Sequence, residues 1–326
     1  MMAQGLAVGG LALTVGLLFL AGYITQRASV CAVAAAREVA RHGSVNRLTG
    51  FLLSAAIATL VMAIDALAGH RVFAQFTGHA VTLPSLIGAA LFAVGAWANG
   101  RCAMGTLADI AAGDLARIGT IAGMVGGIFG GTILFGWWLG GAMVPTAIVS
   151  PYQTMPPELV LALVGSCAAI LAMILRRGLK RAAQPRFWSP LLAMISIGGA
   201  SGALFALDRN WPYTTLLTDI ARGTFDEAGT RAALAFVVLA GSSIAARRGG
   251  LFAVRRGSAG QWTKALASGI VMGLGASLVP GGNEAMLYTG LPLLLPNLAA
   301  AYAVSMMVLI LLAFASERRA RGIFGC

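Results

Sequence analysis

The chain has 326 residues, of which 58% are hydrophobic and only 10% are charged. A soluble domain usually carries about 25% charged residues, so this composition excludes a soluble protein and predicts an all-α integral membrane protein. The net charge of +12 comes from basic residues gathered between apolar segments, which is typical of membrane-protein loops and does not indicate nucleic-acid binding.

Nine apolar runs follow one another along the chain. We expect each to form a transmembrane helix, because about 20 apolar residues cross a hydrocarbon core of about 30 Å. The runs are 5–24, 48–68, 84–99, 118–140, 158–175, 187–206, 231–246, 264–280 and 291–314. Three of them, 84–99, 231–246 and 264–280, are short, since 16 helical residues reach only about 24 Å. We expect adjoining half-helices or loops to complete these crossings.

The first polar interruption follows the first run and reads Gln26-Arg27-Ala28-Ser29-Val30-Cys31. Charge and irregular backbone at membrane depth are tolerated where they line a protein-enclosed or water-filled path. A lone arginine can also anchor a helix end at the headgroups, and a lone cysteine can be a small packing residue. Arg27 lies only four positions before Cys31, which favours a path for a small anion that interacts with sulfur.

The second interruption, Ala98–Thr106, repeats this combination in Asn99, Arg101 and Cys102. We expect a half-helix to start after Gly105 and to point its N–H groups and positive dipole end at the path. A thiol is a weak hydrogen-bond donor and acceptor, so a pair of cysteines suits passage of a sulfur anion better than its capture.

The third motif is Pro280-Gly281-Gly282-Asn283-Glu284. Gly281 and Gly282 allow a sharp turn, and Asn283 offers donors and an acceptor. Glu284 repels an anion unless it is protonated or paired with an arginine. Two interpretations stay open for it: a structural partner of Arg101, or a proton-coupling site. Asp109 and Asp114 are expected to form structural pairs at helix ends.

The remaining cysteines and the histidines indicate no metal site and no cofactor. Cys167, inside an apolar run, is expected to be a small packed residue, and Cys326 ends the chain without an expected role. None of the four cysteines has a zinc-like spacing. His42, His70 and His79 join no motif, and no nucleotide-binding motif or catalytic domain is recognisable, so an enzyme is not expected.

The basic residues orient the chain. Clusters lie at 37–47, 176–186, 247–264 and 318–321, whereas 140–157 contains no basic residue. Nine crossings place every basic cluster on one side of the membrane, which the positive-inside rule makes cytoplasmic. The N-terminus is then outside and the C-terminus inside.

A weak internal repeat relates the two halves. Arg209 follows Arg27 by 182 positions (209 − 27), Gly198 follows Gly16 at the same offset, and Asp219–Arg222 echoes Glu38–Arg41. A fainter echo relates Gly95–Thr106 to Gly273–Glu284.

The repeated units are five spans apart, so they must be inverted. We expect a first half at 1–157 with its cysteine motifs facing the cytoplasm, a central span and cytoplasmic linker at 158–186, and an inverted half at 187–326. Inverted repeats with interrupted helices are typical of transporters.

Together, the three motifs and Gly290-Leu291-Pro292 resemble the YeeE/YedE family of sulfur-transport or thiosulfate-uptake proteins. The resemblance covers nearly the whole chain. It implies an hourglass-shaped protein of the bacterial inner membrane, with re-entrant loops from both sides. It also implies thiosulfate uptake through S–H to sulfur hydrogen bonds, and a small sulfur-carrier protein as a cytoplasmic partner.

Cys31 and Cys102 match two of the family's cysteines, but a third has no match in Gly281-Gly282-Asn283-Glu284. Thiosulfate or a related sulfur or selenium oxyanion is therefore the expected cargo of an inner-membrane permease. A membrane partner that delivers sulfur to a cytoplasmic carrier or transferase is the alternative, and an ion channel is a third interpretation. The expected path residues are Gln26, Arg27, Cys31, Asn99, Arg101, Cys102, Gly105, Thr106, Arg209, Gly281, Gly282, Asn283 and Glu284.

Overall fold

The computed structural model describes residues 2–69, 78–139, 147–180, 189–207, 213–224, 228–279 and 281–323. Within these ranges, seven helices are long and apolar enough to cross a membrane, or up to eight if one bent pair counts as a single span. A further apolar helix, Pro190–Ala206, is shorter. The protein is therefore an all-α, multi-pass membrane protein, as its composition predicted, whereas nine crossings stay a prediction.

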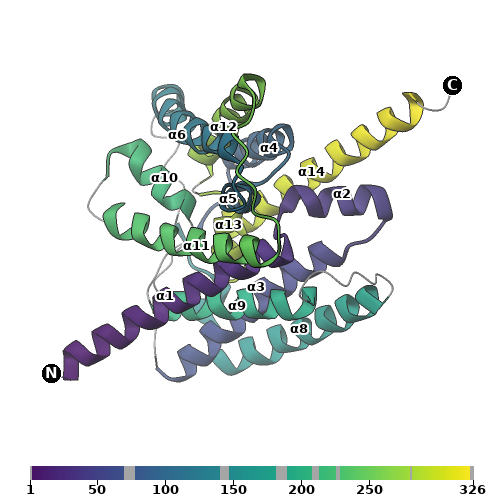
Figure 1. Ribbon diagram of the computed structural model, residues 1–326. Helices are drawn as coiled ribbons and strands as arrows, with labels where there is room; N and C mark the ends of the chain where they lie inside the picture. The colour runs from purple at the N-terminus through teal and green to yellow at the C-terminus, as the bar shows by residue number, and fades with distance from the viewer. Residues whose placement is uncertain are drawn as a thin grey trace.

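The helices alternate between long and short segments (Figure 1). The first half contains α1 (Met2–Ala28), α2 (Ala32–His42), α3 (Asn46–Leu67), α4 (Leu83–Asn99), α5 (Ala103–Ala111), the 3-10 turn η2 (Leu115–Arg117) and α6 (Ile118–Leu139). After α7 (Pro151–Thr154) and α8 (Pro157–Lys180) come α9 (Pro190–Ala206), α10 (Tyr213–Arg222), α11 (Ala228–Arg248), α12 (Ala259–Leu278), α13 (Asn283–Ala285), the π-helical turn η4 (Met286–Gly290) and α14 (Pro296–Ile323). Two short strands, β1 (Gly78–His79) and β2 (Ala147–Ile148), pair antiparallel.

The short helices arise where the backbone leaves helical geometry. Between α1 and α2, Ser29 has a positive φ of 52° and Cys31 is extended. Between α4 and α5, Gly100 ends the helix in the left-handed conformation that glycine favours, and Cys102 is extended. Gly281, with φ 95°, lies at the break before α13. Each break ends one helix and starts a new helix N-terminus inside the protein.

The two halves pack in corresponding ways. Helix α1 packs on α11 as α3 packs on α9, α2 packs on α14 as α10 packs on α6, and α6 packs on α12 as α14 packs on α4. The extra helix α8 packs on α3. In Figure 1 the start of α1 and the end of α14 point to opposite sides of the molecule, and α5 and α13 lie near its centre.

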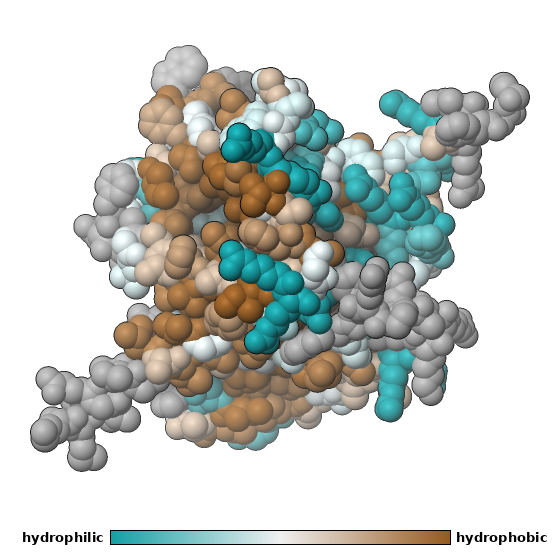
Figure 2. Space-filling view, viewed as in Figure 1, coloured by the Kyte–Doolittle hydropathy of each residue, from teal (hydrophilic) through white to brown (hydrophobic). Residues whose placement is uncertain are grey.

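The surface is largely apolar. Figure 2 shows hydrophobic residues over much of this face, with hydrophilic ones at the right, where α2 and the end of α14 lie, and others across its middle. Only 17% of the apolar window of α8 is buried in the protein, so this helix presents most of its surface to lipid. Cys167 lies on α8 and is exposed. The expectation that it is a packed residue is wrong, because an all-apolar helix does not reveal its buried face.

The three short runs are completed in different ways. Run 84–99 continues through its break into α5, and run 264–280 belongs to α12, which forms a pair bent by 44° with the helical segment 283–290. Run 231–246 needs no adjoining segment, because α11 is itself 21 residues long. Its last turn contains Arg247 and Arg248, whose charges complement the negative end of a helix dipole.

Glycine allows α6 and α12 to pack with their backbones in contact. A Cβ added at Gly127 would fall on the carbonyl oxygen of Ile270, whereas one added at Gly126 meets no described atom within 4 Å. Alanine in place of glycine raises helix stability by about 1 kcal/mol, and overpacking costs about 1–3 kcal/mol. We therefore expect Gly127→Ala to lower the thermal unfolding midpoint in detergent and Gly126→Ala to leave it unchanged or raise it. Equal midpoints for the two variants would contradict this packing.

Candidate functional site

Two buried thiols meet at the N-termini of two short helices. Cys31 precedes α2 and is 2% exposed, while Cys102 precedes α5 and is 1% exposed. The two side chains face each other, and the backbone N–H of Ala32 donates to Sγ of Cys102 over 3.3 Å. The first turns of α2 and α5 therefore meet at one pair of sulfur atoms.

Gly105 makes this approach possible. A Cβ added to it would lie 2.9 Å from Sγ and 3.3 Å from Cβ of Cys31, which is closer than packed atoms normally approach. The prediction that a half-helix starts after Gly105 is wrong, because α5 begins at Ala103. The glycine lies inside the helix and leaves room for the thiol of the neighbouring motif.

Asn99 holds the second motif in shape. Its Nδ2 donates to the carbonyl oxygen of Arg101 over 3.0 Å and to Oγ1 of Thr106 over 2.9 Å. Its Oδ1 accepts from Thr120 over 2.9 Å and from Nη1 of Arg117 over 2.7 Å. Asn99 and Thr106 are both buried, so these bonds fix the break between α4 and α5 rather than leaving both residues open to a ligand.

Arg101 lies between this network and the thiols. Its Nε donates to Oδ2 of Asp109 over 2.9 Å, and its positive charge acts on Cys31 and Cys102. The interpretation that pairs Arg101 with Glu284 is wrong, because the carboxylate that pairs with Arg101 is that of Asp109, about two turns further along on α5. The expected helix-end pairing of the two aspartates is confirmed, since Arg117 Nε lies 3.4 Å from Asp109 and 3.6 Å from Asp114.

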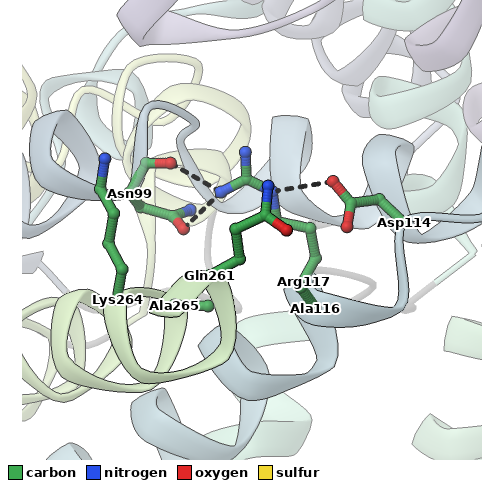
Figure 3. Close-up of a pocket in the computed structure, with 7 residues that line it drawn as sticks. All are labelled: Asn99, Asp114, Ala116, Arg117, Gln261, Lys264 and Ala265. Carbon is green, nitrogen blue, oxygen red and sulfur yellow. Dashed lines mark hydrogen bonds and ion pairs between the residues drawn. The ribbon is translucent and has the colours of Figure 1, made fainter. Parts of the chain in front are cut away.

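A small polar pocket lies beside Asn99. Figure 3 shows Arg117 reaching Asn99 and Asp114, with Lys264 and Gln261 approaching from α12. The pocket has a volume of about 170 Å³. Because Arg117 is already neutralised by aspartates, its contacts here stabilise the motif.

The third motif closes on the start of α10. The N–H of Gly282 donates to Oγ1 of Thr214 over 2.9 Å, and Oε1 of Glu284 accepts from the N–H of Thr214 over 3.3 Å. Gly281 to Glu284 are all buried. Within the described part of the chain, Oδ1 of Asn283 and Oε2 of Glu284 have no hydrogen-bond partner.

The two halves of the site are joined by Tyr213. Its hydroxyl donates to the carbonyl oxygen of Ala103 over 2.8 Å, which links the first turn of α10 to the first turn of α5. The N-termini of α2, α5, α10 and α13 consequently converge on one buried region. Each N-terminus presents the positive end of its helix dipole, and first-turn N–H groups of α2 and α10 already donate to Cys102 Sγ and to Glu284 Oε1, so the region is suited to an anion.

The other predicted path residues are placed differently. Gln26 is buried with an unpartnered Oε1 among the described residues, and Nε of Arg27 is likewise buried without a hydrogen bond there. The Arg27 guanidinium approaches Gly249, just beyond α11, and is not seen to contact a thiol. Arg209 lies outside the described residues, as do Pro280, His70 and Cys326.

Sequence reasoning missed Tyr213 and Thr214. A signal for them was present, because the offset of 182 residues that relates Arg27 to Arg209 also relates Cys31 to Tyr213. The two residues have corresponding places in the structure, since Cys31 precedes α2 and Tyr213 starts α10. Because Tyr213 has a phenol where Cys31 has a thiol, a comparison of residue types does not reveal that the two positions correspond.

The described residues contain no group of three or more His, Cys, Asp or Glu side chains that could hold a metal ion. A comparison with curated proteins finds no match. The family model for sulphur transport matches residues 27–312 and thus covers the second and third motifs and all of the first except Gln26. Because this match includes most of the 326 residues, the chain belongs to the sulphur transport family, the YeeE/YedE family that its motifs resemble.

Proposed function

We propose that this sulfur-transport protein is a permease of the bacterial inner membrane for thiosulfate or a related sulfur or selenium oxyanion. The observation that carries the proposal is the pair of buried thiols, Cys31 and Cys102, at the meeting point of two helix N-termini. The cargo passes between these sulfur atoms and the N-termini of α10 and α13.

Electrostatics supports an anion as the cargo. Each helix N-terminus is equivalent to roughly half a positive charge, and interrupted helices in transporters commonly point such ends at anionic groups. Arg101 adds a partly neutralised positive charge beside the thiols. These contributions stabilise a dianion without a metal ion.

The sulfur contacts support passage rather than tight binding. A thiol donates and accepts weakly, so each contact with a terminal sulfur atom is easily exchanged for the next. The third motif has no cysteine to match the family's third one, and its buried Asn283 offers amide N–H donors instead. An amide prefers oxygen, so sulfite and selenite are the closest alternatives to thiosulfate.

Uptake into sealed vesicles that contain only this protein tests the proposal. Labelled thiosulfate, sulfite, sulfate and selenite are compared with protein-free vesicles, and we expect saturable uptake of at least one sulfur or selenium oxyanion. Uptake that requires an added cytoplasmic sulfur-carrier protein supports the partner interpretation instead. The absence of uptake of all four anions, with and without a carrier, rejects both.

The corresponding packing of the two halves supports an inverted repeat, with the two thiol-bearing motifs at the cytoplasmic side and 187–326 inverted relative to 1–157. In this topology the segment around Val149 lies in the periplasm and the segment around Val254 in the cytoplasm. Both side chains are exposed, by 59% and 64%, and are suitable sites for single cysteines.

We expect a membrane-impermeant maleimide added outside spheroplasts to label Val149→Cys and to spare Val254→Cys until the membrane is opened. The background carries Cys167→Ala and Cys326→Ala, since Cys167 is exposed and the buried Cys31 and Cys102 react slowly. The reverse labelling pattern contradicts the orientation and the positions assigned to the motifs.

A further inference from the structure

A buried carboxyl group lies where α13 meets the start of α10. Among the described residues, Glu284 is the only Asp or Glu with no exposed surface. No described arginine or lysine lies within ion-pair distance of it. Such a group is expensive to bury as an ion, by several kcal/mol, unless something compensates its charge.

The two oxygens of this carboxyl group are in different surroundings. Oε1 accepts from the N–H of Thr214, in the first turn of α10, where the dipole favours negative charge. Oε2 is buried, and the described residues provide no hydrogen-bond partner for it. The helix N-terminus therefore stabilises the ionised form while burial stabilises the protonated form, and the unpartnered Oε2 is the oxygen that is free to accept a proton.

The carboxyl group is connected to the thiol pair. The N–H of Thr214 donates to Oε1 of Glu284, and the adjacent Tyr213 donates to the carbonyl oxygen of Ala103, next to Cys102. Two hydrogen-bonded contacts thus separate the carboxyl group from the sulfur atoms.

The titratable groups nearest to Glu284 among the described residues are phenols, and none of them is a cation. Tyr213 on α10 and Tyr288 on η4 are close enough to interact with it electrostatically, and both are buried phenols. On α5, which also contacts α13, Cys102 interacts electrostatically with Tyr213, and Asp109 is held by Arg101 and Arg117.

We propose that Glu284 carries a proton together with the transported anion, so that the permease is a proton–oxyanion symporter. This inference rests on the proposed function. An ionised carboxyl group repels an oxyanion in the path, whereas a protonated one donates a hydrogen bond to it. Anion binding and proton binding therefore favour each other by the same factor. Glu284 takes the proton from the outside with the anion and releases it to the cytoplasm when the anion leaves.

Steady-state accumulation in proteoliposomes measures this coupling without depending on the transport rate. The membrane potential is held at zero, the outside is made one pH unit more acidic, and labelled thiosulfate is used because it remains a dianion near neutral pH. One proton per anion predicts about tenfold accumulation, because one pH unit corresponds to 1.36 kcal/mol. We expect the wild-type protein to reach this ratio and Glu284→Gln to equilibrate near a ratio of one.

Glu317→Gln is the matched control, because Glu317 is a partly exposed carboxylate that pairs with Arg41 away from the path. It should accumulate thiosulfate like the wild type. A wild-type ratio near one, with uptake intact, overturns the symport inference and leaves the permease standing. A Glu284→Gln ratio near ten overturns it as well. If the wild type takes up none of the anions under any gradient, the proposed function itself fails.

A second measurement decides the case in which Glu284→Gln does not transport. Thiosulfate is added to the purified proteins in weak buffer near neutral pH, and proton uptake is followed with an indicator dye. We expect up to one proton per bound anion for the wild type and for Glu317→Gln, and none for Glu284→Gln. Equal proton uptake by wild type and Glu284→Gln, or none by either, rejects Glu284 as the proton carrier.

Discussion

Cys31→Ala and Cys102→Ala are each expected to lose most thiosulfate uptake at an unchanged amount of folded protein. Both thiols are buried at the meeting point of α2 and α5. Each single substitution leaves only one sulfur atom there, so the anion loses one of its two sulfur contacts. A hydrogen bond to a charged group contributes about 1.5–3 kcal/mol. Its loss at the highest barrier slows transport roughly tenfold to a hundredfold.

Cys167→Ala is the matched control. It makes the same chemical change on α8, a helix that packs on α3 and α9 and carries this thiol exposed, and we expect uptake at the wild-type rate. Initial rates of labelled thiosulfate uptake in proteoliposomes, normalised to reconstituted protein, give the comparison. A Cys31/Cys102 double alanine variant that transports at the wild-type rate would falsify the role of the thiols.

A serine in place of Cys31 tests whether transport needs the sulfur atom itself or only a small polar side chain at this position. Cys31→Ser keeps a small polar side chain in front of α2 and replaces a soft acceptor by a hard one. We expect intermediate uptake of thiosulfate and a smaller loss for sulfite, because a hydroxyl group bonds well to oxygen and less well to sulfur.

Composition was sufficient to predict the class of this protein, and the polar interruptions were sufficient to locate its helix breaks. Charge and irregular backbone are rare in apolar helices, so the motifs at Cys31, Cys102 and Asn283 stand out. The structure places all three in or beside helix breaks that converge. Membership of the sulphur transport family confirms the resemblance that the same motifs carry.

The partners of the charged residues could not be predicted from order along the chain. Glu284 was considered as a partner of Arg101, and Asp109 was expected to form a helix-end pair whose partner the sequence did not name. The structure turns α5 so that Asp109 meets Arg101 and Arg117. Glu284 instead accepts a hydrogen bond from the N–H of Thr214 at the N-terminus of α10. A contact with a backbone N–H cannot be predicted from the pattern of charges.

Gly281 was predicted correctly as a turn residue, since its φ is 95°, but the role predicted for Gly105 was wrong. Gly105 was expected to start a helix, since glycine is common where helices begin or end. The extended residue that starts α5 is Cys102 instead. Gly105 is needed because another segment of the chain passes over it, and such an approach between distant segments is invisible in a single sequence.

Gly105→Ala should consequently disable transport by adding one methyl group. The new Cβ would lie 2.9 Å from Sγ of Cys31 and 3.3 Å from Cδ of Arg101, so the thiol or the first turn of α5 must move. Overpacking of this kind costs about 1–3 kcal/mol, which corresponds to a fivefold to hundredfold lower rate if the strain falls on the path.

Gly199→Ala is the control for this change, because Gly199 is also inside a helix and an added Cβ there meets no described atom within 4 Å. We expect the control to transport at the wild-type rate and Gly105→Ala to transport at least about fivefold more slowly while remaining folded by size-exclusion chromatography. Gly105→Val, with two further methyl groups pressed against Cys31, should be slower still. If Gly105→Ala and Gly199→Ala transport thiosulfate equally fast, the anion does not pass the contact between α5 and Cys31, and the path must lie elsewhere.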